Sequence, residues 1–243
     1  MSDTQPAKSQ RKIYSMKVKE LRDLTSSVRE LVLTSDEDFK FKCGQFVTLH
    51  VPQPEGKPAL RAYSIASTDQ DPRSFKLLFK YVDKGKASEF IWSLQGGETL
   101  HFTGPFGRVF FQEPPTKQII FLNTGTGLSQ HLSYLESKGS LYPQVQFKML
   151  FGVRSESDRY YMAELQELKK RLPHFQYEFV LSRPSENWLG KKGYVQNFIN
   201  EFDYLKNPTT FYLCGNGGMI KETKSLLSAQ EFPSSLIWAE AFD

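Results

Sequence analysis

The chain has 243 residues, enough for one large domain or for two domains of about 100–130 residues that each bury a core. Its 39% hydrophobic and 24% charged residues are typical of a globular protein, and no apolar run reaches the ~18–20 residues that cross a membrane. The net charge of +4 comes without the dense basic stripe of a nucleic-acid-binding protein, although a mildly basic surface would suit an acidic protein partner.

The first twelve residues are rich in Ser, Gln and Lys and lack the apolar core of a signal peptide. We therefore expect a flexible tail over residues 1–12 and a cytoplasmic protein with no membrane segment.

From residue 13 to residue 111, short alternating apolar patterns predict strands separated by Gly, Pro or charged turns. The clearest predicted strands cover residues 28–33, 45–51, 60–67, 75–82 and 99–103. With one helical segment near 86–94, this pattern predicts a small antiparallel β-barrel. Residues 112–117 contain consecutive prolines and are predicted to be a linker.

Over residues 118–243 the predicted strands alternate with predicted helices. The strands cover residues 118–123, 145–152, 175–181, 209–214 and 236–239, and the helices cover 127–138, 160–172, 195–202 and 219–229. This alternation is typical of an α/β doubly wound parallel sheet with helices on both faces. The chain is thus predicted to have two domains.

The composition argues against a metal site built from cysteines. The two cysteines, Cys43 and Cys214, are too few for a cysteine-ligated iron–sulfur cluster, which takes four thiolates, or for a thiolate-rich zinc site. The four histidines are scattered, and no metal site or nucleophile–base pair is predicted.

The most informative stretch reads Arg-Ala-Tyr-Ser-Ile-Ala-Ser over residues 61–67. On a strand, Arg61 and Tyr63 project to one face and Ser64 to the other. A guanidinium binds phosphate in a bidentate fork, so one short segment can reach both the phosphate and the aromatic ring of a ligand that carries the two. Taken alone, the motif also fits an ordinary strand with an exposed arginine.

Two further turns have the features of anion-binding sites. Gly85–Ser88 begins the one helical segment of the barrel half, and residues 123–127, Asn-Thr-Gly-Thr-Gly, lie between the first parallel strand and its helix. Backbone N–H groups at a helix start bind anions, and the second turn is where an open α/β sheet binds a dinucleotide. A helix start without a ligand is the alternative for the first turn, and Gly-x-Gly alone is a weak signal for the second.

In their order, these motifs resemble the ferredoxin–NAD(P) reductase superfamily over roughly residues 13–243. The order is residues 61–67, 85–88, Gly-Pro-Phe-Gly at 104–107, Gly-Thr-Gly at 125–127, Cys-Gly at 214–215 and Glu-Ala-Phe at 240–242. Two departures stand out. Lys84 precedes Gly85 where the family often has a second glycine, and residues 128–130 read Leu-Ser-Gln where it usually has Ile-Ala-Pro.

The resemblance implies a role for each matching residue. FAD would be bound by Arg61, Ala62, Tyr63, Ser64, Lys80, Val82, Gly85, Lys86, Ala87, Ser88 and Phe242. The nicotinamide dinucleotide would be bound by Gly125, Thr126, Gly127, Arg154, Ser182, Arg183, Cys214, Gly215 and Met219. The residues expected to act in the reaction are Ser64, near flavin N5, Cys214, facing the nicotinamide, and Glu240, near the flavin.

The chemistry implied is hydride transfer between NAD(P)H and the flavin, followed by single-electron transfer to a separate acceptor, expected to be an acidic ferredoxin or flavodoxin. The missing cysteine cluster argues against a fused ferredoxin module. An oxygenase-type or free-flavin reductase, and a non-catalytic flavoprotein subunit, remain alternatives. Ser182 and Arg183 favour NADPH, whereas Glu156 and Asp158 would favour NADH. We expect a monomer.

Overall fold

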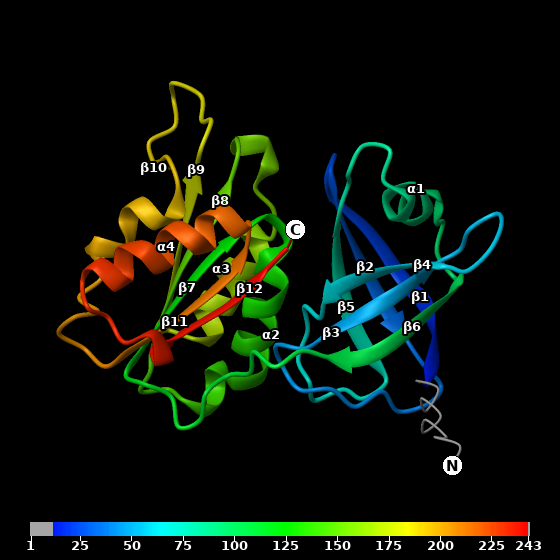
Figure 1. The fold of residues 1–243 in the computed structure, drawn as a ribbon, viewed down its shortest axis with the longest axis horizontal. Helices are drawn as coiled ribbons and strands as arrows, with labels where there is room; N and C mark the ends of the chain where they lie inside the picture. The colour runs from blue at the N-terminus through cyan, green and yellow to red at the C-terminus, as the bar shows by residue number, and fades with distance from the viewer. Residues whose placement is uncertain (1–11, 243) are drawn as a thin grey trace, which may run out of the picture.

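The computed structural model describes residues 12–242, so the tail expected over residues 1–12 lies outside the described residues apart from Lys12. Two six-stranded sheets form the two halves of the molecule, the N-terminal half on the right of Figure 1 and the C-terminal half on the left. None of the helices in residues 12–242 has the length and apolar character that a membrane crossing requires.

The N-terminal half is an antiparallel barrel with strand order β4-β3-β6-β1-β2-β5. Its strands are β1 (Ile13–Thr25), β2 (Val28–Thr34), β3 (Phe46–Val51), β4 (Ala59–Ser64), β5 (Ser74–Lys80) and β6 (Thr99–Phe106). An isolated antiparallel bridge between Ile65 and Leu77 joins the two outer strands, and the Ala66 N–H donates to the Lys76 carbonyl oxygen at 2.8 Å. These contacts close the sheet, which removes its free edges.

Helix α1 (Lys86–Ser93) covers one end of this barrel, because Ala87 and Ile91 are buried in its core. Arg29 of β2 fixes the other side of the helix. Its Nη1 donates to the Ile91 carbonyl oxygen at 3.0 Å, while Nε and Nη2 donate to Asp23 at 2.6 and 3.0 Å. A guanidinium with both partners satisfied can be buried at a helix end, so the C-terminal end of α1 is held in a fixed position.

The C-terminal half is a parallel sheet with strand order β10-β9-β8-β7-β11-β12. Its strands are β7 (Gln118–Thr124), β8 (Gln146–Val153), β9 (Phe175–Leu181), β10 (Lys191–Lys192), β11 (Thr209–Gly215) and β12 (Ile237–Ala241). Its α-helices are α2 (Leu128–Lys138), α3 (Met162–Arg171) and α4 (Gly217–Ala229). The 3₁₀ helices cover Gly125–Gly127, Gly139–Leu141, Glu156–Asp158, Val195–Glu201 and Ser234–Leu236.

Both faces of this sheet are covered. On β7, Ile119 and Phe121 pack with α2 and α3, whereas Ile120 and Leu122 pack with α4. Side chains alternate between the two faces of a strand, so a strand buried on both faces is continuously apolar. That is why residues 118–123 could be identified as a buried strand, and the predicted doubly wound sheet is confirmed.

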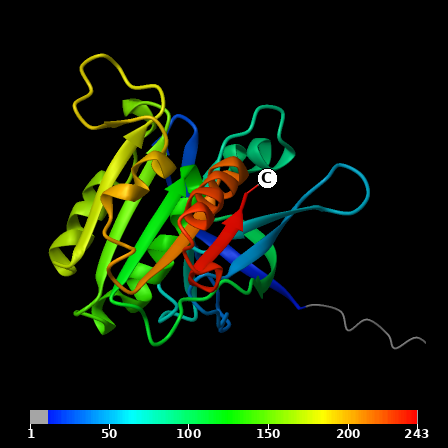
Figure 2. The same cartoon turned by 60° about the vertical axis from the view of Figure 1, so that its left-hand side comes forward.

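Helix α2 lies between the sheet and the barrel and is buried along almost its whole length (Figures 1 and 2). Its Ser133 Oγ donates to the Ser67 carbonyl oxygen at 2.8 Å, and Tyr134 Oη donates to the Val109 carbonyl oxygen at 2.6 Å. Both acceptors belong to the N-terminal part of the chain. Polar side chains can be buried in this helix because they bind backbone groups of the other half.

A second contact joins the halves near α3. Tyr161, with a left-handed backbone at φ 60°, donates its hydroxyl to the buried carboxylate of Glu30 on β2. Burial raises the pKa of Glu30, and Arg22, 3.1 Å from the carboxylate, lowers it. Arg22 also pairs with Glu164 of α3 at 2.6 Å. The two halves are therefore joined near α3 as well as through α2.

Several local expectations were wrong in detail. Residues 195–202, expected to be helical, form the 3₁₀ helix Val195–Glu201, which ends one residue earlier, and β4 ends at Ser64 instead of residue 67. The two-residue strand β10 was not predicted, since two lysines carry no strand pattern.

The buried His131 predicts an acid-sensitive fold. Burial lowers its pKa to about 3, so between pH 6.5 and 3 the unfolded chain binds a proton that the folded chain does not. The free energy of unfolding should therefore decrease as the pH is lowered through this range, and at pH 5 it should be about 2 kcal/mol below its value at neutral pH. In His131→Gln, which keeps an acceptor for the Asn123 amide, the loss between pH 8 and pH 5 in urea unfolding should shrink by this amount. Equal losses in the two proteins would contradict this account.

Candidate functional site

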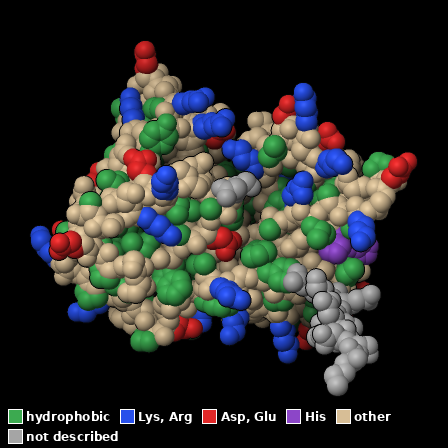
Figure 3. All heavy atoms as spheres, in the orientation of Figure 1, with side chains coloured by type: hydrophobic (Ala, Val, Ile, Leu, Met, Phe, Trp, Pro, Cys, Tyr) green, Lys and Arg blue, Asp and Glu red, His purple; other side chains and the backbone are tan. Residues whose placement is uncertain are grey.

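A cavity of ≈ 670 Å³ opens at the carboxyl ends of β7, β8, β9 and β11, facing the barrel. Strand order reverses between β7 and β11, and open α/β sheets bind ligands at such a switch point. In the space-filling view, several Lys and Arg side chains lie beside the groove between the halves (Figure 3). The barrel contributes Ser27, Val28 and Lys80 to the cavity wall.

The floor of the cavity is made by two loops in close contact. The Asn216 N–H donates to Thr124 Oγ1 at 2.8 Å, and Asn216 Oδ1 caps α4 by accepting from the Met219 N–H at 3.1 Å. A Cβ on Gly127 would overlap the Cys214 carbonyl, and one on Gly215, at φ +123°, would overlap Thr124. Only glycine permits this approach.

Gly125 differs from these two glycines, because a Cβ there would meet no atom within 4 Å. Its carbonyl oxygen accepts from Tyr160 Oη at 2.8 Å, which anchors the turn. Gly125 lines the cavity, so its backbone is open to a ligand.

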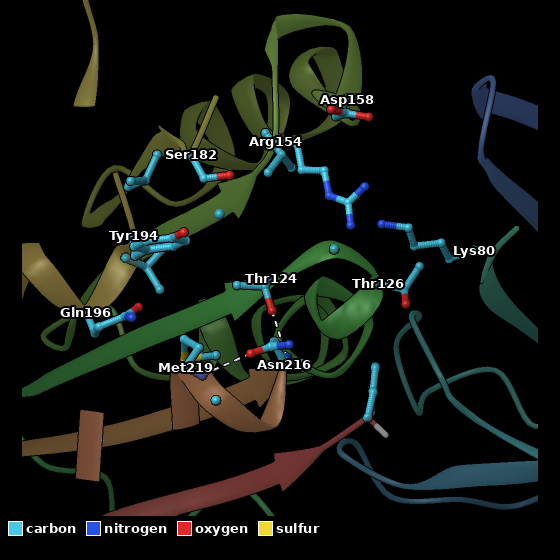
Figure 4. Close-up of a pocket in the computed structure, with 18 of the residues that line it drawn as sticks. Lys80, Thr124, Thr126, Arg154, Asp158, Ser182, Tyr194, Gln196, Asn216 and Met219 are labelled. Atoms are coloured by element: carbon cyan, nitrogen blue, oxygen red, sulfur yellow. Dashed lines mark hydrogen bonds between the residues drawn. The ribbon is translucent and has the colours of Figure 1, made fainter. Parts of the chain in front are cut away.

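Two cations from different halves converge over this turn. In Figure 4 the guanidinium of Arg154, after β8, and the ammonium of Lys80, at the end of β5, point toward each other, with the Thr126 hydroxyl beside Lys80. No ion pair of Lys80 or Arg154 is found within the described residues 12–242. Two unpaired cations that face each other repel unless an anion lies between them, so the residues fit the diphosphate of a dinucleotide.

Ser182, predicted to bind the adenosine end, lines the cavity together with Tyr194, whose side chain is 61% exposed. Arg183 does not line it. Its side chain is exposed, and its N–H donates to the Arg154 carbonyl oxygen at 2.7 Å, which puts it at the rim. Nearby, Asp158 accepts from the Ser155 N–H and hydroxyl at 2.9 and 2.6 Å, so this acid is engaged by the turn.

Strand β4 has an unusual surface for a barrel strand. Leu60, Arg61 and Ala62 are exposed in succession, and Leu60 is 53% exposed. Tyr63 packs against Phe79 with ring centroids 4.4 Å apart, and burial raises its pKa to about 12. An exposed apolar strand beside a guanidinium fits a flat aromatic ligand that carries phosphate.

The turn before α1 is built around Ser88. Its buried Oγ accepts from the Val82 N–H at 2.8 Å, so the hydroxyl holds the turn. Gly85 is the N-cap residue, and Lys86 donates to Gln53 Oε1 at 2.7 Å. Val82 is 61% exposed, and Ala87 packs inward. The first N–H groups of a helix have no partner within it, which is the arrangement that binds an anion.

Three residues far apart in sequence meet where the halves touch. Ser64 Oγ donates to Glu240 Oε1 at 3.1 Å, and Gln130 Nε2 donates to Glu240 Oε2 at 3.3 Å. Burial raises the pKa of Glu240, while these two hydrogen bonds lower it. The Phe242 N–H donates to the Gly215 carbonyl oxygen at 2.8 Å, and Phe242 lines the cavity.

Cys214 pairs with Glu240 across β11 and β12 but is fully buried and does not line the cavity. Burial raises the pKa of its thiol well above the usual range. Its expected contact with the nicotinamide therefore stays a prediction.

Most of the predicted nucleotide-binding residues come together here. The predicted residues on the cavity wall are Lys80, Gly125, Thr126, Arg154, Ser182, Gly215, Met219 and Phe242. Sequence reasoning missed Thr124, Tyr160, Tyr194, Asn216 and Gln130. Asn216 alone had a readable signal, since Asn between a strand and a helix is a preferred N-cap.

Comparison with known proteins identifies both halves. An oxidoreductase FAD-binding domain matches residues 15–111, and an oxidoreductase NAD-binding domain matches residues 121–225. Ferredoxin–NADP reductase B of Sorangium cellulosum is 36% identical over 184 residues, covering 74% of this chain and 75% of that protein. The anthranilate 1,2-dioxygenase electron transfer component of Acinetobacter baylyi is 27% identical over 203 residues, covering 83% of this chain and 58% of that protein.

Solved structures share the fold. Ferredoxin NADP⁺ reductase from Neisseria gonorrhoeae, with bound FAD and NADP, superposes with a TM-score of 0.82 at 22% identity, covering 96% of this chain and 99% of that chain. Amycolatopsis cytochrome P450 reductase GcoB superposes with a TM-score of 0.87 at 23% identity, covering 96% of this chain and 71% of that chain.

The fold, the cavity and these matches define a two-domain NAD(P)H-dependent flavin oxidoreductase that uses FAD and a nicotinamide dinucleotide. The chain belongs to the ferredoxin reductase-like superfamily. It spans only about three fifths of the length of several relatives that are oxygenase reductase components.

The position of Arg61 predicts that the positive charge of its guanidinium strengthens FAD binding. The purified protein should hold about one FAD per chain, and Arg61→Ala should weaken FAD binding by about 1.5–3 kcal/mol, the range of a hydrogen bond to a charged group. Arg73→Ala is the matched control, because Arg73 pairs with Asp38 beyond the opposite end of β5 from Lys80. FAD dissociation constants measured by fluorescence test this, and equal values for both variants would remove Arg61 from the site.

Proposed function

We propose that this chain takes electrons from NADPH and passes them through FAD to a separate protein acceptor, a ferredoxin or a flavodoxin. The observation that carries the proposal is that one cavity receives residues from both halves: Lys80 and Val28 from the barrel, and Gly125, Arg154 and Met219 from the parallel sheet. A site built in this way lets two dinucleotides meet.

When both cofactors are bound, they would supply the redox chemistry, which is hydride transfer followed by single-electron transfer to the acceptor. The chain's own residues would bind the two cofactors and position them. Lys80 and Arg154 would neutralise diphosphate charge, and Arg61 would hold the FAD phosphate. Tyr63 and Phe242 would cover the flavin ring and exclude water.

Ser64 and Glu240 would supply a proton path at the flavin. In the structure the Ser64 hydroxyl donates to the Glu240 carboxylate. When Glu240 is protonated, the hydrogen bond reverses, and Ser64 can take the Glu240 proton as it gives up its own. Cys214, behind them on β11, would pack toward the nicotinamide. Such a pair needs only small movements of protons, which suits a reaction in which the cofactors carry the electrons.

The preference for NADPH is expected to depend on Arg183. A 2′-phosphate at the rim would meet the Ser182 hydroxyl and the exposed Arg183 guanidinium, whereas Arg154, facing Lys80, would contact a group that both cofactors share. Arg183→Ala should lower kcat/KM for NADPH by about tenfold to hundredfold and leave that for NADH unchanged. Arg154→Ala should lower both. If Arg183→Ala leaves the ratio of the two efficiencies intact, the 2′-phosphate is bound elsewhere.

The acceptor can be identified by comparing candidate acceptors in the same assay. The 36% identity with a ferredoxin–NADP reductase supports a ferredoxin, while the dioxygenase electron transfer component supports an oxygenase partner. NADPH oxidation by the FAD-loaded protein should accelerate at least about tenfold with an acidic ferredoxin or flavodoxin and fall with rising salt. Acceleration by free flavin alone would identify a free-flavin reductase, and no turnover with ferricyanide would indicate a non-catalytic subunit.

A further inference from the structure

Gln130, the third residue of α2, contacts two segments that lie far from it in the sequence. Its side chain is fully buried, and its Nε2 donates to the Gly44 carbonyl oxygen at 3.4 Å and to Glu240 Oε2 at 3.3 Å. Gly44 belongs to the barrel half, and Glu240 lies on β12. The amide therefore joins the carboxylate of the proposed proton path to both halves of the molecule.

The chemistry of these neighbours fixes the orientation of the amide. A backbone carbonyl and a carboxylate oxygen can only accept, and a glutamine amide has two donor hydrogens on Nε2 and none on Oε1. Both hydrogens are therefore used, one on each neighbour. Oε1 of Gln130 is buried and has no hydrogen-bond partner among residues 12–242. The flipped amide, with Oε1 and Nε2 exchanged, would place Oε1 against two acceptors and lose both hydrogen bonds.

The acceptor at Gly44 is itself held rigidly. At φ +90°, Gly44 has no room for a side chain, since a Cβ would lie 2.5 Å from the Val109 carbonyl oxygen and 2.6 Å from the Tyr134 ring. Tyr134, also on α2, donates to that same Val109 oxygen. The Gln130 amide is thus fixed from the barrel side.

We propose that Gln130 is a positioning residue that holds Glu240 Oε2 as an acceptor and leaves Oε1, which faces Ser64, as the oxygen that carries the exchangeable proton. The inference rests on the proposed roles of Ser64 and Glu240. When Glu240 is protonated, the proton lies on Oε1 and is donated to Ser64 Oγ, whose own hydrogen points onward. When Glu240 is ionised, Ser64 donates back to Oε1, so one proton has passed along the path.

The surroundings of Glu240 allow the effect of Gln130 on the pKa of Glu240 to be measured. Its titratable neighbours are Cys214 on β11 and Tyr134 on α2, and burial raises the pKa of both above their usual ranges. Both are therefore neutral near pH 7. The hydrogen bonds from Ser64 and Gln130 are what lower the pKa of Glu240 against the effect of its burial.

The test is the pKa of Glu240 in FAD-loaded protein, read from ¹³C NMR titration of labelled glutamate carboxyls and assigned with Glu240→Gln. Gln130→Met keeps the length of the side chain and removes its donor. This variant should raise the pKa of Glu240 by about 1–2 pH units, the loss of one hydrogen bond to a charged group. The acid limb of flavin reduction by NADPH should move by the same amount.

Ser133→Ala is the matched control. It removes another hydrogen bond between α2 and the barrel, to the Ser67 carbonyl oxygen, without touching Glu240, and should leave the pKa of Glu240 unchanged. An unchanged pKa in Gln130→Met, or an equal rise in Ser133→Ala, overturns the inference. Gln130→Leu gives the same reading if the methionine variant does not fold.

The test also separates this inference from the proposed function. If Glu240→Gln reduces its flavin at the wild-type rate, Glu240 has no part in the reaction. A raised pKa of Glu240 in Gln130→Met would still support the positioning role of Gln130.

Discussion

The burial of α2 between the sheet and the barrel is the constraint on which the rest of the structure depends. One helix presents apolar side chains such as Leu132 and Leu135 to the sheet and polar ones to the barrel backbone. Because α2 packs against both halves, they cannot separate without exposing a continuous core that contains Phe121 of the sheet and Leu78 of the barrel. The cavity owes its fixed geometry to this shared core.

The same constraint explains where the chemistry lies. The N-terminal end of α2 follows the Gly125–Gly127 turn, so the element that joins the halves also begins at the nucleotide cavity. Lys80 of the barrel and Glu240 of the parallel sheet are placed beside that end by the packing of the halves. A change in the packing of α2 would therefore reach both the charge and the proton chemistry of the site.

The sequence predicted what depends on local patterns and missed what depends on packing. Apolar runs and glycine turns identified the barrel, the parallel sheet and the loops that follow its strands, because these features are set within ten or so residues. The contact between Gln130 and Glu240 joins residues 110 positions apart, and that between Glu30 and Tyr161 joins residues 131 positions apart. Gln130 was visible only as a departure from a family pattern. Nothing in the sequence indicated what its amide would bind.

The closure of the barrel also has a dynamic consequence. Ser64 is the last residue of β4, and the single bridge between Ile65 and Leu77 that closes the barrel follows it directly. Apart from backbone pairing, the seam is held by the Ser67 hydroxyl, which accepts from the Lys76 N–H at 3.1 Å, and by the packing of Tyr63 against Phe79. A junction with so few bonds opens locally at a lower free energy than the whole domain unfolds. Amide hydrogen exchange at Ala66 and Lys76, whose N–H groups donate across the seam, would report that opening, and the same opening would limit the lifetime of the Ser64–Glu240 contact.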